Sequence, residues 1–197
     1  MSRPIAFVDL DSTVDDTLPA WLQRIYEKTG IRAGVSDIVN WNIATCSVFR
    51  YVDPQTIYDI VDEPGFTASL PLLKGAQTCL YKMQNDLEWD VYFVTARYGR
   101  SSMPETLWRM KRYFPWLDAE KRLCFLHDKS MLRGDLLIDD KMDNLVAYRN
   151  AHPAAALITI DYPYNRFRDF DGLHRVAYDE KAWDHIYQIV KKINLER

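Results

Sequence analysis

The chain has 197 residues, of which 48% are hydrophobic and 27% charged, proportions that are ordinary for a globular protein and exclude a disordered or low-complexity chain. Its 25 basic and 28 acidic residues give a formal net charge of −3, so no basic field attracts duplex nucleic acid. The sequence contains no apolar run of 18 residues, which predicts no contact with a membrane. The three cysteines are too widely spaced for a disulfide framework or a zinc site, and the N-terminus lacks signal-peptide features, so we expect a cytoplasmic protein.

The first predicted element is a strand at residues 5–8, a continuous apolar run that is followed at once by Asp9. Continuous apolar runs, as opposed to alternating ones, are typical of strands that are buried on both faces of a sheet. The next such run begins only at Val91. About 80 residues therefore separate the two predicted strands, whereas a simple β–α–β crossover takes about 30.

The long interval after the first strand contains helical patterns. Apolar residues between positions 18 and 26 repeat with the spacing of one helix face, and a second helical stretch begins at Asp53. We interpret residues 15–72 as a small helical cap inserted after the first strand. The α/β core is then formed by residues 1–14 together with residues 73–197.

The rest of the chain alternates predicted strands and helices. Further strands are expected at residues 91–94, 123–126, 136–138 and 156–160, and helices near residues 75–83, 104–111, 142–150 and 181–195. Ser101 or Ser102 is expected to cap the helix near residue 104. This alternation predicts an α/β fold, a Rossmann-like parallel sheet flanked by helices, with the small helical cap after the first strand.

Two pairs of carboxylates directly follow predicted strands. Asp9 and Asp11 come after the first strand, and Asp139 and Asp140 come after the strand at residues 136–138. Ligands bind at the carboxyl ends of parallel strands, so these side chains are expected at one edge of the sheet. Carboxylates brought together there need protons or a cation between them, and Mg²⁺ suits an all-oxygen site that also takes a phosphate oxygen. The alternative is that they only cap the turns and helices that follow.

Two further residues are candidates for binding a phosphate. Thr95 follows the strand at residues 91–94, where its hydroxyl and backbone N–H can bind a phosphoryl oxygen. Lys129 lies in the loop after the strand at residues 123–126. Each is a weak signal alone, because a threonine after a strand is common and most lysines lie on the surface.

The order of these residues, Asp-x-Asp-x-Thr, then Thr, then Lys, then Asp-Asp, resembles the four motifs of the haloacid dehalogenase superfamily of phosphohydrolases. Response-regulator receivers use similar residues, but their lysine comes last. Residues 64–66 (PGF), 74–76 (KGA) and 134–140 (GDLLIDD) are also similar to stretches of the 5′(3′)-deoxyribonucleotidases. The likeness covers roughly residues 5–145.

The resemblance implies a role for each motif residue. Asp9 would attack phosphorus and form an aspartyl-phosphate, and Lys129 would neutralise the phosphate. Asp11 would protonate the leaving oxygen and then deprotonate the water that cleaves the intermediate. We expect a raised pKa for Asp11, because a neighbouring carboxylate and desolvation both favour the protonated form. Thr95 would hold a phosphoryl oxygen, and Ser130 is a further candidate for this contact.

The resemblance also implies a Mg²⁺ cofactor. Asp9, Asp140 and the backbone carbonyl of Asp11 would bind the ion, and Asp139 would support it through water or hydrogen bonds to the ligands. Substrate contacts are expected elsewhere. Arg97 stands where relatives have proline, and it either grips the phosphate or a second anionic group or points into solvent.

The cap is expected to supply substrate specificity. Trp41 and Phe66 are candidates for stacking on a nucleobase, whereas Trp21 lies on the apolar stripe of its helix and is expected in the core. Thr17 and Thr67 occupy positions where the family has phenylalanine, so the sequence leaves the base preference open.

Together these observations predict a Mg²⁺-dependent phosphatase of deoxyribonucleoside monophosphates. Two alternatives remain: the same chemistry on a sugar phosphate, a nucleic-acid 3′-phosphate end or another small phosphomonoester, and a phosphate-binding protein without catalysis. The expected partner is a small phosphorylated molecule, and a homodimer is left open.

Overall fold

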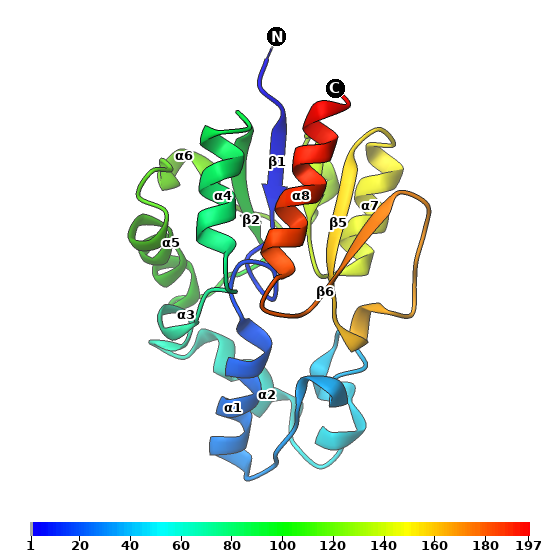
Figure 1. The fold of residues 1–197 in the computed structure, drawn as a ribbon. Coiled ribbons are helices and arrows are strands. Elements are labelled where there is room, and N and C mark those ends of the chain that lie inside the picture. The colour runs from blue at the N-terminus through cyan, green and yellow to red at the C-terminus, as the bar shows by residue number, and fades with distance from the viewer. Residues whose placement is uncertain (1) are drawn as a thin grey trace.

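The computed structural model describes residues 2–197 and contains one six-stranded sheet in which every neighbouring pair of strands is parallel. The strand order is β3-β2-β1-β4-β5-β6 (Figure 1). The strands are β1 (Ile5–Val8), β2 (Asp90–Thr95), β3 (Leu123–Phe125), β4 (Leu136–Ile138), β5 (Ala156–Asp161) and β6 (Leu173–Ala177). The order reverses at β1, and such a switch point is where open α/β sheets bind ligands.

The helices cover both faces of this sheet. They are α1 (Thr17–Thr29), α2 (Pro54–Asp59), α3 (Phe66–Ser69), α4 (Ala76–Asn85), α5 (Ser102–Tyr113), α6 (Ala119–Arg122), α7 (Met142–Ala151) and α8 (Ala182–Leu195). Ala6 and Val8 of β1 share one apolar cluster with residues of α4 and α8, whereas Phe7 shares a second cluster with residues of α7. Side chains of a strand alternate between faces, so the continuous apolar run in β1 buries both sides of the sheet.

The predicted α/β fold is confirmed, and all five predicted strands are present in it. The sequence analysis missed β6, which pairs only with β5 at the edge of the sheet. Its sequence, LHRVA, includes His174 and Arg175, so it is not a continuous apolar run. Edge strands commonly carry such charged residues, because one side of the strand faces solvent.

The chain between β1 and α4 forms the lower lobe in Figure 1, with α1, α2, α3 and short 3-10 turns. Helix α1 buries Leu18, Leu22 and Ile25, and it ends at Gly30, whose φ of 73° suits glycine. The buried apolar residues of this lobe pack in the same cluster as those of the sheet. The core is thus continuous, and the division at residues 15 and 72 stays a prediction.

A side chain of the lobe caps a helix of the core, and a side chain of the core caps a helix of the lobe. Neither Ser101 nor Ser102 caps α5 through its side chain, contrary to expectation. Instead, Asp62 of the lobe accepts hydrogen bonds from the backbone N–H groups of both serines, each at 3.1 Å. Glu105 of α5 in turn accepts from the backbone N–H groups of Gly65 and Ala68 around the start of α3, at 2.6 and 2.9 Å.

None of the helices in residues 2–197 combines the length and apolar character needed to cross a bilayer.

Candidate active site

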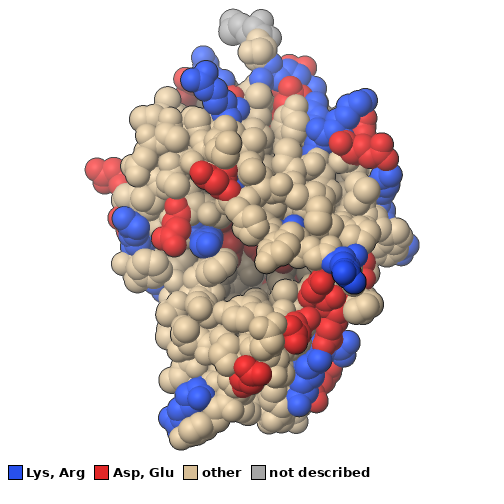
Figure 2. Space-filling model, turned by 180° about the vertical axis from the view of Figure 1, so that it is seen from behind, with Lys and Arg blue, Asp and Glu red and all other residues tan. Residues whose placement is uncertain are grey.

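The predicted motif residues converge at the carboxyl edge of the sheet. Asp9 follows β1, Thr95 ends β2, Lys129 lies in the turn after β3, and Asp139 and Asp140 follow β4. All five are buried. Asp9, Lys129, Asp139 and Asp140 line a cavity of about 350 Å³ between the sheet edge and the lobe, and Figure 2 shows the surface hollowed between these two parts. The volume of this cavity is in the range of small-molecule binding sites.

Lys129 bridges the two carboxylate pairs. Its Nζ lies 2.5 Å from Asp9 Oδ1 and 2.6 Å from Asp139 Oδ2. Burial alone favours the neutral amine, but the charges of Asp139 and Asp9 outweigh it and raise the pKa of Lys129. The ammonium is therefore a fixed positive charge beside the predicted nucleophile.

Asp9, Asp139 and Asp140 form a cluster in which one oxygen of each lies within 4.8 Å of the others. Burial, followed by repulsion from Asp139 and Asp11, raises the pKa of Asp9 to about 7 against the opposing charge of Lys129. Burial and the charges of Asp9 and Asp139 raise the pKa of Asp140 well above its usual range. Three buried carboxylates facing one ammonium have a surplus of negative charge, and their all-oxygen donor set fits Mg²⁺.

Asp139 is tied down by its own neighbours. Its Oδ1 accepts from the Lys141 backbone N–H at 2.8 Å, and Asn144 Nδ2 lies 3.2 Å from Oδ1 and 3.0 Å from Oδ2. Both oxygens of Asp139 are therefore occupied, including the bond from Lys129. This arrangement agrees with a supporting role at a metal site. No sequence signal marked Asn144, which lies in the first turn of α7.

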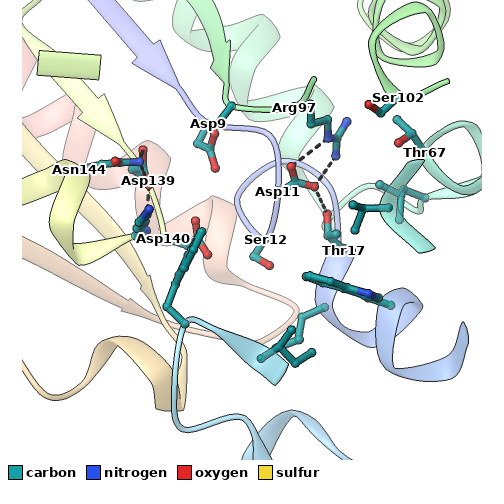
Figure 3. Close-up of a pocket in the computed structure, with 18 of the residues that line it drawn as sticks. Asp9, Asp11, Ser12, Thr17, Thr67, Arg97, Ser102, Asp139, Asp140 and Asn144 are labelled. Atoms are coloured by element: carbon teal, nitrogen blue, oxygen red, sulfur yellow. Dashed lines mark hydrogen bonds and ion pairs between the residues drawn. The ribbon is translucent and has the colours of Figure 1, made fainter. Parts of the chain in front are cut away.

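Asp11 faces away from this cluster and toward Arg97 (Figure 3). Arg97 Nε donates to Asp11 Oδ2 at 2.9 Å, and Nη2 donates to Oδ1 at 2.6 Å, while the Thr17 hydroxyl donates to Oδ1 at 2.8 Å. Burial would raise the pKa of Asp11, but the charge and hydrogen bonds of Arg97 outweigh it and lower this pKa. The expected upward shift is wrong, because the closest charge is a guanidinium from a distant loop and not a carboxylate.

Arg97 belongs to a network of four charges, in which Asp11 is 39% exposed and the other three side chains are buried. Its Nη2 also lies 2.8 Å from Asp15 Oδ2, and Asp15 Oδ1 lies 2.5 Å from Arg109 Nη2. The side chains of Asp15 and Arg109 are fully buried, and that of Arg97 is 7% exposed. Arg97 borders the cavity and does not point into solvent. Contact with a substrate anion remains a prediction, since most of its N–H groups already have partners.

Two of the predicted phosphate contacts are not on the cavity wall. Thr95 is buried, and its Oγ1 accepts from the backbone N–H of Arg97 at 3.2 Å. The Ser130 hydroxyl donates to Asp128 Oδ1 at 2.6 Å. Neither residue lines the cavity, whereas Ala96, directly after Thr95, does. Their proposed contacts with phosphate therefore stay predictions.

The half of the cavity that belongs to the lobe is apolar and aromatic. Phe66 and Trp41 line it, as does Trp21, which was expected in the core. Trp21 lies where α1 meets both the core and the cavity, and its Nε1 donates to the Ile57 carbonyl at 2.9 Å. The other apolar residues of this half are Leu18, Ile38, Ile43, Tyr58, Val61 and Leu70.

The cavity is also lined by residues to which the sequence analysis assigned no role. Lys141 Nζ lies 3.7 Å from the ring centre of Trp41, a cation–π contact between the core and the lobe. Tyr98 and His127 contact each other edge to face, with ring centres 5.5 Å apart, and both line the cavity. Tyr164, after β5, lines it beside Asp140.

The fold is that of haloacid dehalogenase-like hydrolases. A family member from Xanthomonas campestris superposes with a TM-score of 0.53 at 11% identity, covering 100% of this chain and 99% of that structure. CbbY from Rhodobacter sphaeroides, solved in complex with phosphate, gives 0.52 at 11% identity, covering 94% of this chain and 96% of that one. At such low identity these likenesses establish the fold.

Sequence comparison establishes the family. Residues 3–195 match the family described as 5′ nucleotidase, deoxy (Pyrimidine), cytosolic type C protein. The 5′(3′)-deoxyribonucleotidase of Clostridium acetobutylicum is 30% identical over 152 residues, covering 76% of this chain and 79% of that relative. A putative 5′(3′)-deoxyribonucleotidase of Bordetella pertussis is 31% identical over 130 residues, covering 64% of each. The chain therefore belongs to the nucleotidase family matched over residues 3–195, and it is a phosphoric monoester hydrolase. This finding confirms the predicted resemblance to the 5′(3′)-deoxyribonucleotidases.

Proposed function

We propose that this protein hydrolyses 5′- or 3′-deoxyribonucleoside monophosphates with Mg²⁺, through an aspartyl-phosphate formed on Asp9. One observation carries the proposal: Asp9, Lys129, Asp139 and Asp140 lie together on the floor of a cavity whose other half is apolar and aromatic. The floor suits a phosphate, and the opposite wall suits a nucleobase. Family membership supports the same substrate class.

Asp9 is the nucleophile in this mechanism. Lys129 occupies Asp9 Oδ1, so the other oxygen is the one that attacks phosphorus. The new bond joins that oxygen to phosphorus as the ester bond breaks, and the electron pair leaves with the sugar oxygen. Lys129 neutralises charge on the phosphoryl group, which otherwise repels an attacking carboxylate.

Asp11 is the general acid and base in this mechanism. The pairing with Arg97 lowers the pKa of Asp11 and favours its carboxylate form, which is the form that accepts a proton from the water that cleaves the aspartyl-phosphate. In the preceding step it has to hold a proton for the leaving oxygen. Over a full cycle the protons balance, because the proton that Asp11 gives to the leaving oxygen is regained from the water that cleaves the aspartyl-phosphate.

Asp9, Asp140 and the backbone carbonyl of Asp11 would hold the Mg²⁺, with Asp139 supporting them. The fit rests on the surplus negative charge of three buried carboxylates around one ammonium. When bound, the ion would neutralise phosphoryl oxygens and help to orient the phosphate.

The base would stack in the lobe. Trp41, Phe66 and Trp21 present aromatic rings to the cavity, and stacking of a base on such a ring contributes roughly 1–3 kcal/mol. Stacking tolerates every base, because each base has a π face. The polar side chains on this side, Thr67 and Ser102, lie near Arg97 (Figure 3) and are the candidates for contacts with the sugar or the edge of the base.

A substrate panel tests the proposal. Phosphate release is measured from dUMP, dTMP, their 3′ isomers and a sugar phosphate such as glucose 6-phosphate, with Mg²⁺ and with EDTA. We expect the deoxynucleotides to be hydrolysed with Mg²⁺ and not with EDTA. Turnover of the sugar phosphate only would overturn the nucleotide assignment, and full activity in EDTA would overturn the metal requirement.

An Asp9→Asn variant tests the covalent step. Acid quenching during turnover of ³²P-labelled dUMP should trap label on the wild-type protein and none on this variant, which we expect to be inactive. Wild-type activity in the variant would contradict nucleophilic catalysis by Asp9.

A further inference from the structure

The turn that follows β5 contacts Asp140 twice. The Tyr164 hydroxyl donates to Asp140 Oδ2 at 2.5 Å, and both residues are buried, at 4% and 7% exposure. Asn165 Nδ2 donates to the Asp140 backbone carbonyl at 3.0 Å. Two successive residues of one turn therefore hold both the side chain and the main chain of a predicted metal ligand.

Residues of β5 and β6 hold this turn in place. Asn165 Nδ2 also donates to the Ile160 carbonyl at 2.8 Å, which ties it to the end of β5. Arg175 of β6 donates to Asn165 Oδ1 at 2.7 Å and to the Asn165 carbonyl at 3.2 Å. The ring of Tyr164 stacks on that of Tyr162, with centroids 5.2 Å apart and planes 9° apart. The position of the Tyr164 hydroxyl is thus set by the two strands at one edge of the sheet.

A carboxylate held through one oxygen presents its other oxygen in a fixed direction. Without the Tyr164 hydroxyl, the Asp140 carboxylate would lose the hydrogen bond that fixes its direction and keep the charges of Asp9, Asp139 and Lys129 around it. Partners of this kind orient metal ligands, and their loss typically weakens metal binding by about 10–100-fold. If Tyr164 served only as packing, its ring would matter and its hydroxyl would not.

We propose that Tyr164 is a positioning residue of the metal site, which fixes the Asp140 carboxylate in the orientation that binds the cation. The inference rests on the proposed function in one respect, since it requires a divalent cation at the cluster of Asp9, Asp139 and Asp140. It goes further in assigning the turn at Pro163–Asn165, which lies outside the four motifs, to the metal site.

Tyr164→Phe is the test variant, because it removes one oxygen and keeps the stacked ring. Tyr178→Phe is the matched control: its hydroxyl donates to Asp16 Oδ1 at 2.8 Å, and its ring contacts the same Tyr162, with centroids 4.6 Å apart. Binding of Mn²⁺ is measured directly from the electron paramagnetic resonance signal of the free ion, and binding of Mg²⁺ by competition. Circular dichroism in EDTA checks that both variants are folded.

We expect the dissociation constant for Mn²⁺ to rise at least about 10-fold in Tyr164→Phe and to stay unchanged in Tyr178→Phe. In an Asp140→Asn background, Tyr164→Phe should add no further loss, because its effect acts through that carboxylate. The kinetic counterpart is a higher Mg²⁺ concentration for half-maximal activity, with kcat largely restored at saturating Mg²⁺.

Equal dissociation constants for wild type, Tyr164→Phe and Tyr178→Phe would overturn the inference while leaving the proposed function intact. The inference is also wrong if Tyr164→Phe weakens binding by the same factor in the Asp140→Asn background as in the wild type. A wild-type protein that binds no Mn²⁺ and hydrolyses dUMP in EDTA would instead overturn the metal part of the proposed function, and this inference with it.

Discussion

Arg97 holds the carboxylate of Asp11 through two parallel hydrogen bonds, 2.9 Å from Nε to Oδ2 and 2.6 Å from Nη2 to Oδ1. The same guanidinium reaches Asp15, which in turn pairs with Arg109. The network therefore contains two positive and two negative charges in a largely buried space. It joins the loop after β1, the loop after β2 and helix α5 behind the cavity.

Breaking this network should destabilise the fold. Arg97→Met leaves Asp11 without its cation and Asp15 with one partner, and breaking a buried ion pair typically costs about 3–5 kcal/mol of unfolding free energy. Chemical denaturation in urea measures the change. Lys74→Met is the control, because Lys74 pairs with Glu180 on the surface, where both side chains are more than 70% exposed, and it should leave the unfolding midpoint unchanged. If the two substitutions changed the urea midpoint equally, the network around Arg97 would contribute no more to stability than a surface ion pair does.

The convergence of the motif residues could be predicted because parallel strands share a carboxyl edge. A strand followed by Asp9 and another followed by Asp139 and Asp140 must bring these carboxylates together if the strands are neighbours, as β1 and β4 are. The partner of Asp11 could not be predicted, because Arg97 lies 86 positions away and the spacing does not show which way it points. Trp21 packs against the core, as expected, and its place on the cavity wall could not be predicted for a related reason: one helix stripe faces both the core and the cavity.

Capping of α5 by Asp62 should make stability depend on pH. The backbone N–H groups of Ser102 and Ser101 lower the pKa of Asp62. An aspartate with a lowered folded-state pKa stabilises the fold above its unfolded pKa of about 3.9, and this contribution disappears as the pH falls through the folded value. Asp62→Ala should therefore cost about 1 kcal/mol at pH 7 and progressively less below pH 4.

Thermal unfolding of Asp62→Ala and wild type across pH 2.5–7 measures this difference. Asp37→Ala is a suitable comparison, since the Asp37 carboxylate accepts a local hydrogen bond from Gly34 N–H and, among the described residues, none from another helix. A difference between Asp62→Ala and wild type that persists unchanged at pH 2.5 would contradict the assignment of Asp62 as an ionised cap.

The contact of Lys141 with Trp41 predicts a role for both in holding the base. Trp41 is 51% exposed at the cavity mouth, so removing it should cost binding and not folding. Trp41→Ala should raise KM for dUMP about 5–160-fold, the range that loss of one base-stacking contact gives, with a smaller effect on kcat. Trp41→Phe should restore most of the affinity. The inhibition constant of inorganic phosphate is the control, because phosphate lacks a base, and a parallel loss of phosphate affinity would contradict a stacking role.

Removal of the metal should lower stability as well as activity. A ligand that binds only the folded protein raises the free energy of unfolding by about 2.7 kcal/mol when its concentration is 100 times its dissociation constant. Mg²⁺ should therefore raise the urea midpoint of the wild-type protein relative to EDTA. Asp140→Asn removes a ligand carboxylate and relieves repulsion in the cluster, so it should be at least as stable as wild type in EDTA yet gain much less from Mg²⁺. The comparison needs both proteins in both conditions at pH 7. A Mg²⁺ effect of equal size in wild type and Asp140→Asn would place the stabilising ion somewhere other than this cluster.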